Sequence, residues 1–182
     1  MNETTKWALI MALLLCIFNL SDIAAAEKPG PLVTVPHVDL NRYLGTWYEI
    51  ASYPAWFQRG CTGSTAEYAL LPNGRIRVIN RCFKNSLDGP LKESTGKAEV
   101  VDATTNARLK VWFFWPFKGD YWIIDLDPNY QWVVVGVPSR KYLWILSCTP
   151  TMDEAIYQGI VDRLIHQAYD PSRLQRTPQP TN

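Results

Sequence analysis

The chain has 182 residues, a length typical of a single domain, and its 18 basic and 17 acidic side chains nearly cancel. Nothing in this balance indicates the excess of basic residues typical of a nucleic-acid-binding protein, and we expect no nucleic-acid partner. Aromatic residues are abundant instead, with 8 Trp, 9 Tyr and 6 Phe. Because aromatic side chains are bulky and some carry a polar tip, they suit a pocket that is only partly polar.

The first 26 residues are typical of a secretory signal peptide. Lys6 precedes an apolar run from Trp7 to Phe18, and three alanines ending at Ala26 supply the small residues of a cleavage site. The run is too short to span a bilayer comfortably. Cleavage after Ala26 would export the chain to the periplasm or outer membrane, or secrete it if the source is not bacterial. Cysteines can pair in such oxidising compartments.

Lipid anchoring at Cys16 is the alternative, because the residues Leu-Leu-Leu-Cys before and at this position loosely resemble a bacterial lipobox. That motif requires a small residue directly before the cysteine, where this chain has Leu15. The apolar run also continues past Cys16. Cleavage after Ala26 is therefore the prediction, with the lipid anchor as the second interpretation.

Residues 27–36 contain three prolines and predict an extended lead-in, after which short strands alternate with turns. Asn73-Gly74 is typical of a tight hairpin turn, because both residues accept positive φ angles. Eight strands are predicted, at residues 45–53, 64–71, 75–82, 93–102, 108–115, 120–126, 130–137 and 142–148.

Alternation of apolar and polar residues gives several of these strands one apolar face. Ile76, Val78 and Asn80 share a face opposite three arginines, and Phe113 shares a face with Leu109 and Val111. Such faces must be covered by other apolar surface.

One helix is predicted after the last strand. Thr151 and Glu154 form a capping box at its start, and Ile156, Ile160 and Leu164 follow at helical spacing. One short helix is too small to cover eight strands, so the sheet must close on itself. The predicted fold is all-β, an eight-stranded antiparallel barrel with one C-terminal α-helix packed outside.

Three short motifs resemble those of the lipocalin family. Gly45 and Trp47 match its Gly-x-Trp motif, and Asp127 and Tyr130 match the second motif, Thr-Asp-x-x-Tyr, with Leu in place of Thr. The segment YLWILSCTP resembles the third. The resemblance covers residues 37–175 and is greatest to bacterial outer-membrane lipocalins and to apolipoprotein D. It implies an up-and-down barrel over 37–175, including the helix. The polar, proline-containing end of the chain predicts a flexible tail over 176–182.

The resemblance also implies a role for two residues at the closed end of the barrel. Trp47 begins the first strand and would form the floor of the barrel. A basic residue of the third motif commonly packs over this tryptophan in the family, and Cys148 takes its place here. The cation–π contact of the family, worth about 0.5–2 kcal/mol, would then be missing.

Up-and-down strand order distinguishes the three cysteines that remain after cleavage. Cys61 precedes the second strand and Cys82 ends the third, so both lie at the open rim, whereas Cys148 lies at the closed end. We therefore expect a Cys61–Cys82 disulfide and a free Cys148. The alternative is three buried, unpaired cysteines.

The resemblance to apolipoprotein D implies a ligand site inside the barrel. The ligand would be a fatty acid, a lysophospholipid or a similar small hydrophobic molecule, stored or transported in support of the cell envelope. Core packing is the alternative role of Phe113 and Trp144, whereas an inward Asn80 indicates a polar ligand group or a trapped water. The ligand-facing residues would be Tyr68, Asn80, Phe113, Tyr121 and Trp144.

Other aromatic residues would point outward. Trp112 and Phe114 alternate with Phe113, and Trp115 and Phe117 flank the next turn. An apolar patch of this kind marks a membrane-surface or protein contact, whereas scattered surface aromatics are the simpler interpretation.

Catalytic motifs are lacking. The two histidines, His37 and His166, lie outside any metal-binding pattern, and we expect no metal, no cofactor and no enzymatic activity. Two other hypotheses stay open: a lipid-modifying enzyme of the same fold that uses Cys148, and a partner-binding module. The chain is expected to be a monomer or a weak homodimer.

The processing route gives the first testable prediction. Intact-mass analysis of the exported protein should show a chain that begins near Glu27, because Leu15 disfavours lipid modification. A diacylated N-terminal Cys16 would contradict it.

Overall fold

The structure, a computed structural model, describes residues 29–180. The predicted signal peptide and the alternative lipidation site at Cys16 lie outside the described residues. The chain divides into two units, Met1–Gly30 and Pro31–Asn182, and every helix and strand considered below belongs to the second.

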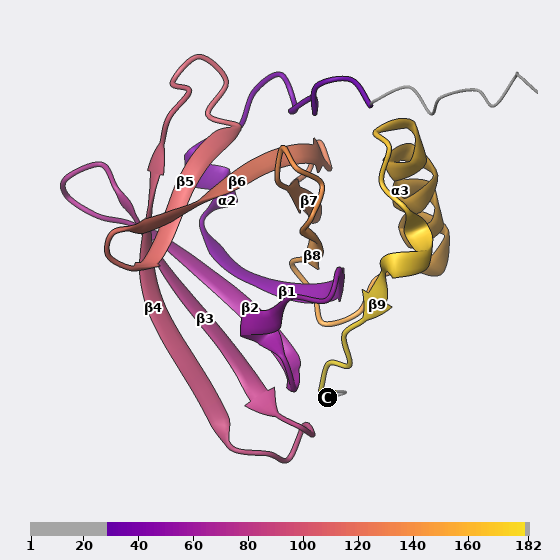
Figure 1. Ribbon diagram of the computed structural model, residues 1–182. Helices are drawn as coiled ribbons and strands as arrows, with labels where there is room; N and C mark the ends of the chain where they lie inside the picture. The colour runs from indigo at the N-terminus through magenta and orange to yellow at the C-terminus, as the bar shows by residue number, and fades with distance from the viewer. Residues whose placement is uncertain (1–28, 181–182) are drawn as a thin grey trace, which may run out of the picture. The chain divides into compact units, whose positions relative to one another are not determined.

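The second unit contains a closed antiparallel barrel, which confirms the predicted fold. Its strands form one sheet in the order β2-β3-β4-β5-β6-β7-β8-β1-β9, and pairing of β1 with β2 closes the ring (Figure 1). Consecutive strands are neighbours from β1 to β8, so the topology is up-and-down. The strands are β1 (Gly45–Ser52), β2 (Cys61–Leu70), β3 (Ile76–Lys84), β4 (Leu91–Val100), β5 (Arg108–Phe114), β6 (Phe117–Leu126), β7 (Trp132–Gly136), β8 (Leu143–Ser147) and β9 (Gln175–Arg176).

The predicted strands all occur, with ends that shift by a few residues. The largest differences are at the starts of β2 and β6, which begin earlier than predicted. Cys61 pairs with Lys84 and Phe114 pairs with Phe117, each beyond an irregularity in the ladder. Antiparallel pairing therefore continues where the alternation of side chains is interrupted.

Strand β7 shows why part of the wall reads as a continuous apolar run. Val133 and Val135 belong to the cluster inside the barrel, and Val134 belongs to the cluster outside it. All three are fully buried. A strand that is covered on both faces carries no polar alternation.

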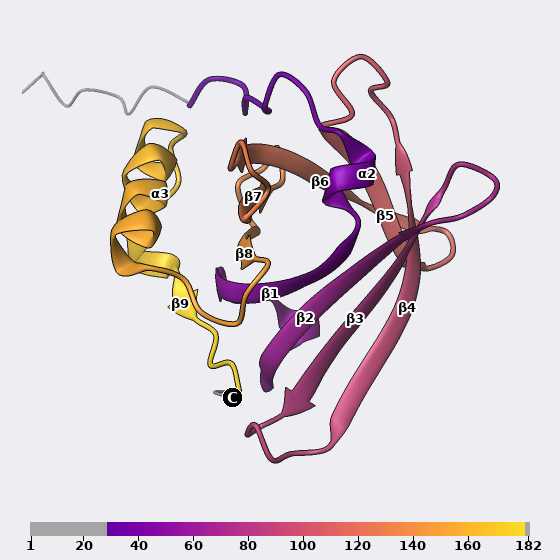
Figure 2. The same cartoon turned by 180° about the vertical axis from the view of Figure 1, so that it is seen from behind.

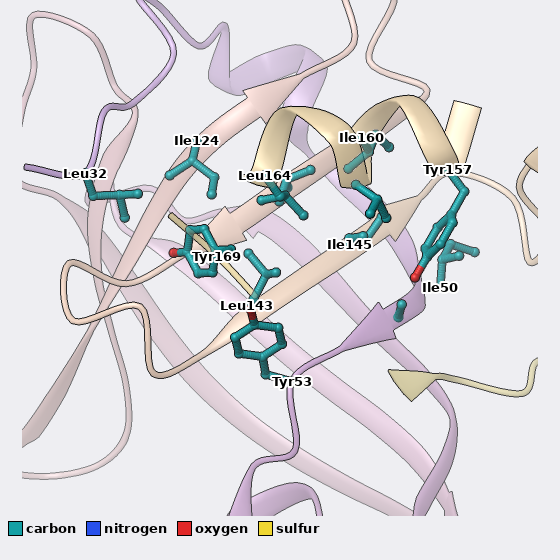
Figure 3. Close-up of a cluster of buried hydrophobic side chains, with 13 residues drawn as sticks. Leu32, Ile50, Tyr53, Ile124, Leu143, Ile145, Tyr157, Ile160, Leu164 and Tyr169 are labelled. Atoms are coloured by element: carbon teal, nitrogen blue, oxygen red, sulfur yellow. The ribbon is translucent and has the colours of Figure 1, made fainter. Parts of the chain in front are cut away.

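Helix α3 (Glu154–His166) covers this wall from outside (Figure 3). It packs in one cluster with Ile124 of β6 and Ile145 of β8. The buried face of α3 consists of Tyr157, Ile160, Val161 and Leu164.

Within residues 29–180, no helix has the length and apolar character needed to cross a membrane.

Two details of α3 differ from the prediction. The N-cap is Asp153, whose carboxylate accepts hydrogen bonds from the amides of Ala155 and Ile156, and not Thr151. The buried stripe follows the spacing i, i+3, i+4, i+7 from Tyr157. Ile156 therefore lies at its edge and is 45% exposed.

The ladder that closes the barrel is short. Residues 45–48 of β1 pair with residues 65–68 of β2, and the β2–β3 register shifts between Thr62 and Thr65. Gly63, inside this bulge, has a φ angle of +55°, which glycine adopts without strain. Strands β2, β3 and β4 run on past the end of this ladder (Figure 2).

A disulfide joins the start of β2 to β3. Cys61 and Cys82 are bonded, with their Cα atoms 5.4 Å apart, which confirms the predicted pair. Cys148 is a free cysteine. The bond holds together two strand ends at the open rim, beside the bulge at Gly63.

The C-terminal segment differs from the flexible tail that the sequence predicts. After the short helix η2 (Pro171–Arg173), β9 pairs with Ala51 and Ser52 of β1. The amide of Thr177 then donates to the carbonyl of Ile50. Backbone pairing thus extends the fold beyond residue 176 despite the local prolines, and residues 181–182 lie outside the described residues.

The disulfide is tested by a double substitution. Cys61→Ser with Cys82→Ser should lower the free energy of unfolding by about 3 kcal/mol, because the unfolded chain loses a cross-link that spans 21 residues. Urea unfolding followed by circular dichroism measures the change. Cys148→Ser is the control and should change stability by less than about 0.5 kcal/mol. An equal effect of the control would contradict the prediction.

Candidate ligand cavity

Trp47, predicted to form the floor of the barrel, is buried at the closed end with 1% of its surface exposed. Its indole Nε1 donates to the carbonyl of Tyr43 at 2.9 Å. The Tyr43 ring packs against the indole with ring centroids 5.2 Å apart. Because a buried indole N–H needs an acceptor, this hydrogen bond allows a large aromatic group to fill the floor.

Tyr43 reaches the interior from α2 (Leu40–Tyr43), a single helical turn before β1. Asp39 caps this turn, and its amide donates to the hydroxyl of Tyr130 at 2.8 Å. The guanidinium of Arg42 lies over the Tyr130 ring, 4.1 Å from its centre. Tyr130 of the second motif therefore anchors the turn that carries Tyr43.

Asp127, the other residue of the second motif, organises the turn between β6 and β7. Its carboxylate accepts hydrogen bonds from the amides of Asn129 and Gln131, at 3.0 and 3.1 Å. The turn holds Tyr130 at a positive φ angle of 62°. The second motif is thus placed at the closed end as a supporting element.

Cys148 lies beside this turn and does not fill the floor position predicted for it. Strand β8 ends one residue earlier, and the side chain of Cys148 is exposed, with Sγ donating to the carbonyl of Tyr130 at 3.0 Å. Partial burial, together with the charge of Asp127, raises the pKa of the thiol. The sulfur is therefore a protonated thiol at neutral pH, which is a poor nucleophile.

Three tyrosines meet above the floor. The hydroxyl of Tyr121 is 2.6 Å from that of Tyr43 and 2.9 Å from that of Tyr68. Tyr68 and Tyr121 were predicted to line the cavity, and the structure brings them together. Tyr43 was missed, although it stands four residues before Trp47, because nothing in its short helix indicates an inward direction.

Burial controls the charge of this tyrosine cluster (Tyr43, Tyr68 and Tyr121). It raises the pKa of all three hydroxyls well above the usual value. The three groups are therefore neutral at physiological pH and hold three hydrogens between them. Two hydrogen bonds within the cluster use two of these hydrogens, which leaves one for a further acceptor.

Trp144 stands near the open end of the interior, on β8. Its indole Nε1 donates to Oε1 of Gln58 at 2.8 Å, and its ring lies 6.4 Å from that of Phe57. Both partners come from η1 (Trp56–Gln58), a short helix in the loop between β1 and β2. The loop that contains η1 therefore contacts Trp144, a predicted ligand-facing residue.

Glu49 extends the same network. Its carboxylate is buried and accepts hydrogen bonds from Nε2 of Gln58 at 2.8 Å and from Oγ of Ser52 at 3.0 Å. A cleft of about 410 Å³ lies here, lined by β1, the η1 loop and the C-terminal segment, and none of the predicted ligand-facing residues lines it. Glu49 and Gln58 were missed by the sequence reasoning. The signal for Glu49 was a charge two residues after Trp47, on the same face of β1.

Phe113 and Asn80 lie in different surroundings. Phe113 is half-buried and packs with the interior cluster, and a Cβ at Gly96 would approach its ring to 2.7 Å. Gly96 thus makes room for the ring. Asn80 shares a strand face with Ile76 and Val78 but is exposed, so the expected need of a buried amide for a partner does not apply.

The outward aromatics occupy the hairpin between β5 and β6. Phe114, Trp115 and Phe117 are 76–80% exposed, whereas Trp112 is partly covered by Lys118, whose Nζ lies 4.7 Å from its ring centre. This hairpin belongs to the same end of the barrel as the η1 loop, because loops alternate between the ends of an up-and-down barrel. Trp56 of that loop is also 75% exposed.

In the described part of the chain, no group of three or more His, Cys, Asp or Glu side chains is placed to hold a metal ion. The candidate site is therefore an aromatic interior with a neutral hydrogen-bonding cluster near its floor and a polar network near its rim.

The sequence matches the family model described as a lipocalin-like domain over residues 38–179. It is 40% identical over 153 residues to temperature-induced lipocalin-1 of Arabidopsis thaliana, covering 80% of this chain and 81% of that protein. It is also 40% identical over 161 residues to the outer membrane lipoprotein Blc of Escherichia coli K12, covering 87% and 90%. Identity to bovine apolipoprotein D is 30% over 148 residues, covering 78% and 77%.

Solved structures share the fold at lower identity. Insecticyanin from the tobacco hornworm Manduca sexta superposes with a TM-score of 0.69 at 17% identity, covering 84% of this chain and 87% of that one. At this identity the likeness concerns the fold alone.

The tyrosine cluster is tested by Tyr121→Phe. This change removes two hydrogen bonds inside the barrel and should lower the free energy of unfolding by about 1–3 kcal/mol. Because folding raises the pKa of the buried hydroxyls, stability should also fall as pH rises above about 10, and it should fall less steeply in the variant. Urea unfolding between pH 7 and 11 measures both effects.

Tyr48→Phe is the matched control, because Tyr48 lies on the opposite face of β1 from Trp47. It should leave stability at neutral pH almost unchanged. Equal slopes for Tyr121→Phe and the wild-type protein would show that the cluster does not control the alkaline transition.

Proposed function

Because the chain belongs to the lipocalin family, we propose that it binds a fatty acid, a lysophospholipid or a similar small hydrophobic molecule inside the barrel. It stores or transports this ligand and catalyses no reaction. The observation that carries the proposal is the contrast along the interior. Side chains near the floor are fully buried, whereas inward residues nearer the rim, such as Phe113 and Trp144, keep accessible surface.

The apolar wall suits an acyl chain. Each buried methylene contributes about 0.8 kcal/mol, so about ten methylenes would contribute about 8 kcal/mol before the entropic cost of binding. Phe113, Tyr121 and Trp144 would line this chain. Hydrophobic contact of this kind needs shape more than precise polar chemistry.

Two places suit the polar end of a ligand. The tyrosine cluster, which includes Tyr68, has one hydroxyl hydrogen to donate to a carboxylate or ester oxygen. Asn80 is an exposed amide on the face of β3 that also carries Val78. These positions support the assignment of both residues to polar parts of the ligand.

The exposed aromatics favour a contact with a membrane surface as part of the same function. Trp56 and Trp115 project from loops at the open end, the end through which a lipid would enter. Aromatic side chains are enriched at membrane–water interfaces. Export to the cell envelope fits this proposal, and the Escherichia coli relative is named an outer membrane lipoprotein.

A lipid-modifying enzyme has less support. Its best nucleophile, Cys148, lies outside the wall at the closed end, and the raised pKa of its thiol disfavours the reactive thiolate.

Ligand binding is tested by comparing Trp144→Ala with Trp112→Ala. The first change removes inward contact area and should weaken the affinity for a fluorescent fatty acid about tenfold. Trp112 lies on the outer face under Lys118, so its loss should change affinity by less than about twofold. Displacement titrations give the affinities, and circular dichroism checks the fold.

Trp144→Phe separates packing from hydrogen bonding, because it keeps a ring but loses the bond to Gln58. It should retain most of the affinity. Equal losses from the inward and outward tryptophans would show that the faces are misassigned. Absence of saturable binding by the wild-type protein would remove the carrier function.

A further inference from the structure

The gap beyond the short β1–β2 ladder is filled by the C-terminal segment. The last ladder pair is Tyr48 with Thr65, so Glu49 and Ser64 stand next to each other where pairing stops. The side-chain amide of Gln179 donates to both of their carbonyls, at 2.7 and 2.9 Å. One amide group therefore satisfies one acceptor on each strand.

Backbone hydrogen bonds join the same segment to both strands. The carbonyl of Pro178 accepts from the amide of Gly63 on β2 at 2.8 Å, and the amide of Thr177 donates to Ile50 of β1 at 3.0 Å. Proline has no amide hydrogen, so Pro178 leaves no unpaired donor in the gap. The positive φ angle of Gly63 bends β2 at the place where its amide meets the segment.

Hydrogen bonds between side chains link the segment to Trp144, at the open end of the barrel interior. The hydroxyl of Thr177 donates to the carboxylate of Glu49, which also accepts from Gln58. Gln58 in turn accepts from the indole of Trp144. The position of the C-terminal segment is therefore coupled through two side chains to the open end of the interior.

We propose that the seam between β1 and β2 is a binding site for an extended peptide, occupied by the chain's own residues 177–179, and that release of this segment speeds ligand exchange. The seam suits an uncharged segment because the segment's own bonding groups are the Pro178 carbonyl, the Thr177 amide and hydroxyl, and the Gln179 side-chain amide. The part concerning ligand exchange rests on the proposed function, whereas the seam itself does not.

The occupant is the chain's own tail because the preceding residues lead directly into the seam. β9 pairs with β1, and the guanidinium of Arg176 bonds to Glu154 of α3 and lies 3.2 Å from the ring centre of Tyr157. These contacts hold residue 176 beside the gap. The effective concentration of the segment is then far above that of a segment from another molecule.

The seam is tested by hydrogen exchange of the Gly63 amide in the full chain. Gln179→Ala, and the shape-preserving Gln179→Glu, whose carboxylate cannot donate, should each speed this exchange by about fivefold or more. Gln175→Ala changes the same tail outside the seam and should leave the rate within twofold. Unchanged exchange at Gly63 in both Gln179 variants would overturn the proposal, whether or not any lipid binds.

Ligand exchange is tested separately. In Thr177→Val with Gln179→Ala, a bound fluorescent fatty acid should dissociate several-fold faster than from the wild-type protein. Faster amide exchange with an unchanged dissociation rate would overturn the coupling and keep the seam. If protection of Gly63 rises with protein concentration and a dimer appears on sizing, the occupant is a second copy's tail, and the assignment to the chain's own tail is wrong.

Discussion

The structure depends on strand β1, which closes the sheet into a barrel by pairing with β8 on one side and with β2 on the other. Its ladder with β2 spans only residues 45–48. Three other features keep the ring closed: the buried Trp47 packed on Tyr43, the disulfide at Cys61, and the tail that carries Gln179. The packing acts at the floor, the disulfide at the rim and the tail between them. The interior exists because these contacts join two strands that their backbones hold only over part of their length.

The interior changes character along its depth, and desolvation is the cause. Near the floor, the hydroxyls of Tyr43 and Tyr68 are hydrogen-bonded to that of Tyr121, and burial keeps all three neutral. Near the rim, Trp144 donates a hydrogen bond to Gln58 of the η1 loop, and both residues keep accessible surface. A hydrophobic ligand would thus meet neutral hydroxyl groups near the floor of the barrel and partly exposed side chains near its rim.

Alternation predicted much of the wall, because side chains on a strand change face at every residue. It placed Phe113 beside the interior cluster, and it indicated the strand that carries Tyr68. It failed for a residue beyond the end of a strand, and for a residue whose burial depends on how deep in the barrel it lies. Cys148 follows the last residue of β8 and is exposed, and Asn80 lies on the expected face but outside the buried zone. An alternating pattern predicts the face of the sheet on which a side chain lies, but not its position along the depth of the barrel.

The sequence by itself determined the strands, the closure into a barrel, the external helix, the disulfide partners and the family, since each follows from local periodicity, strand order or a short motif. Only the tertiary structure decided the hydrogen bonds between distant segments. Glu49 meets Thr177 across 128 residues, and Gln58 meets Trp144 across 86. Such contacts depend on where loops and tails come to rest, which is set by the sum of many packing interactions. No periodic pattern in the sequence predicts these contacts.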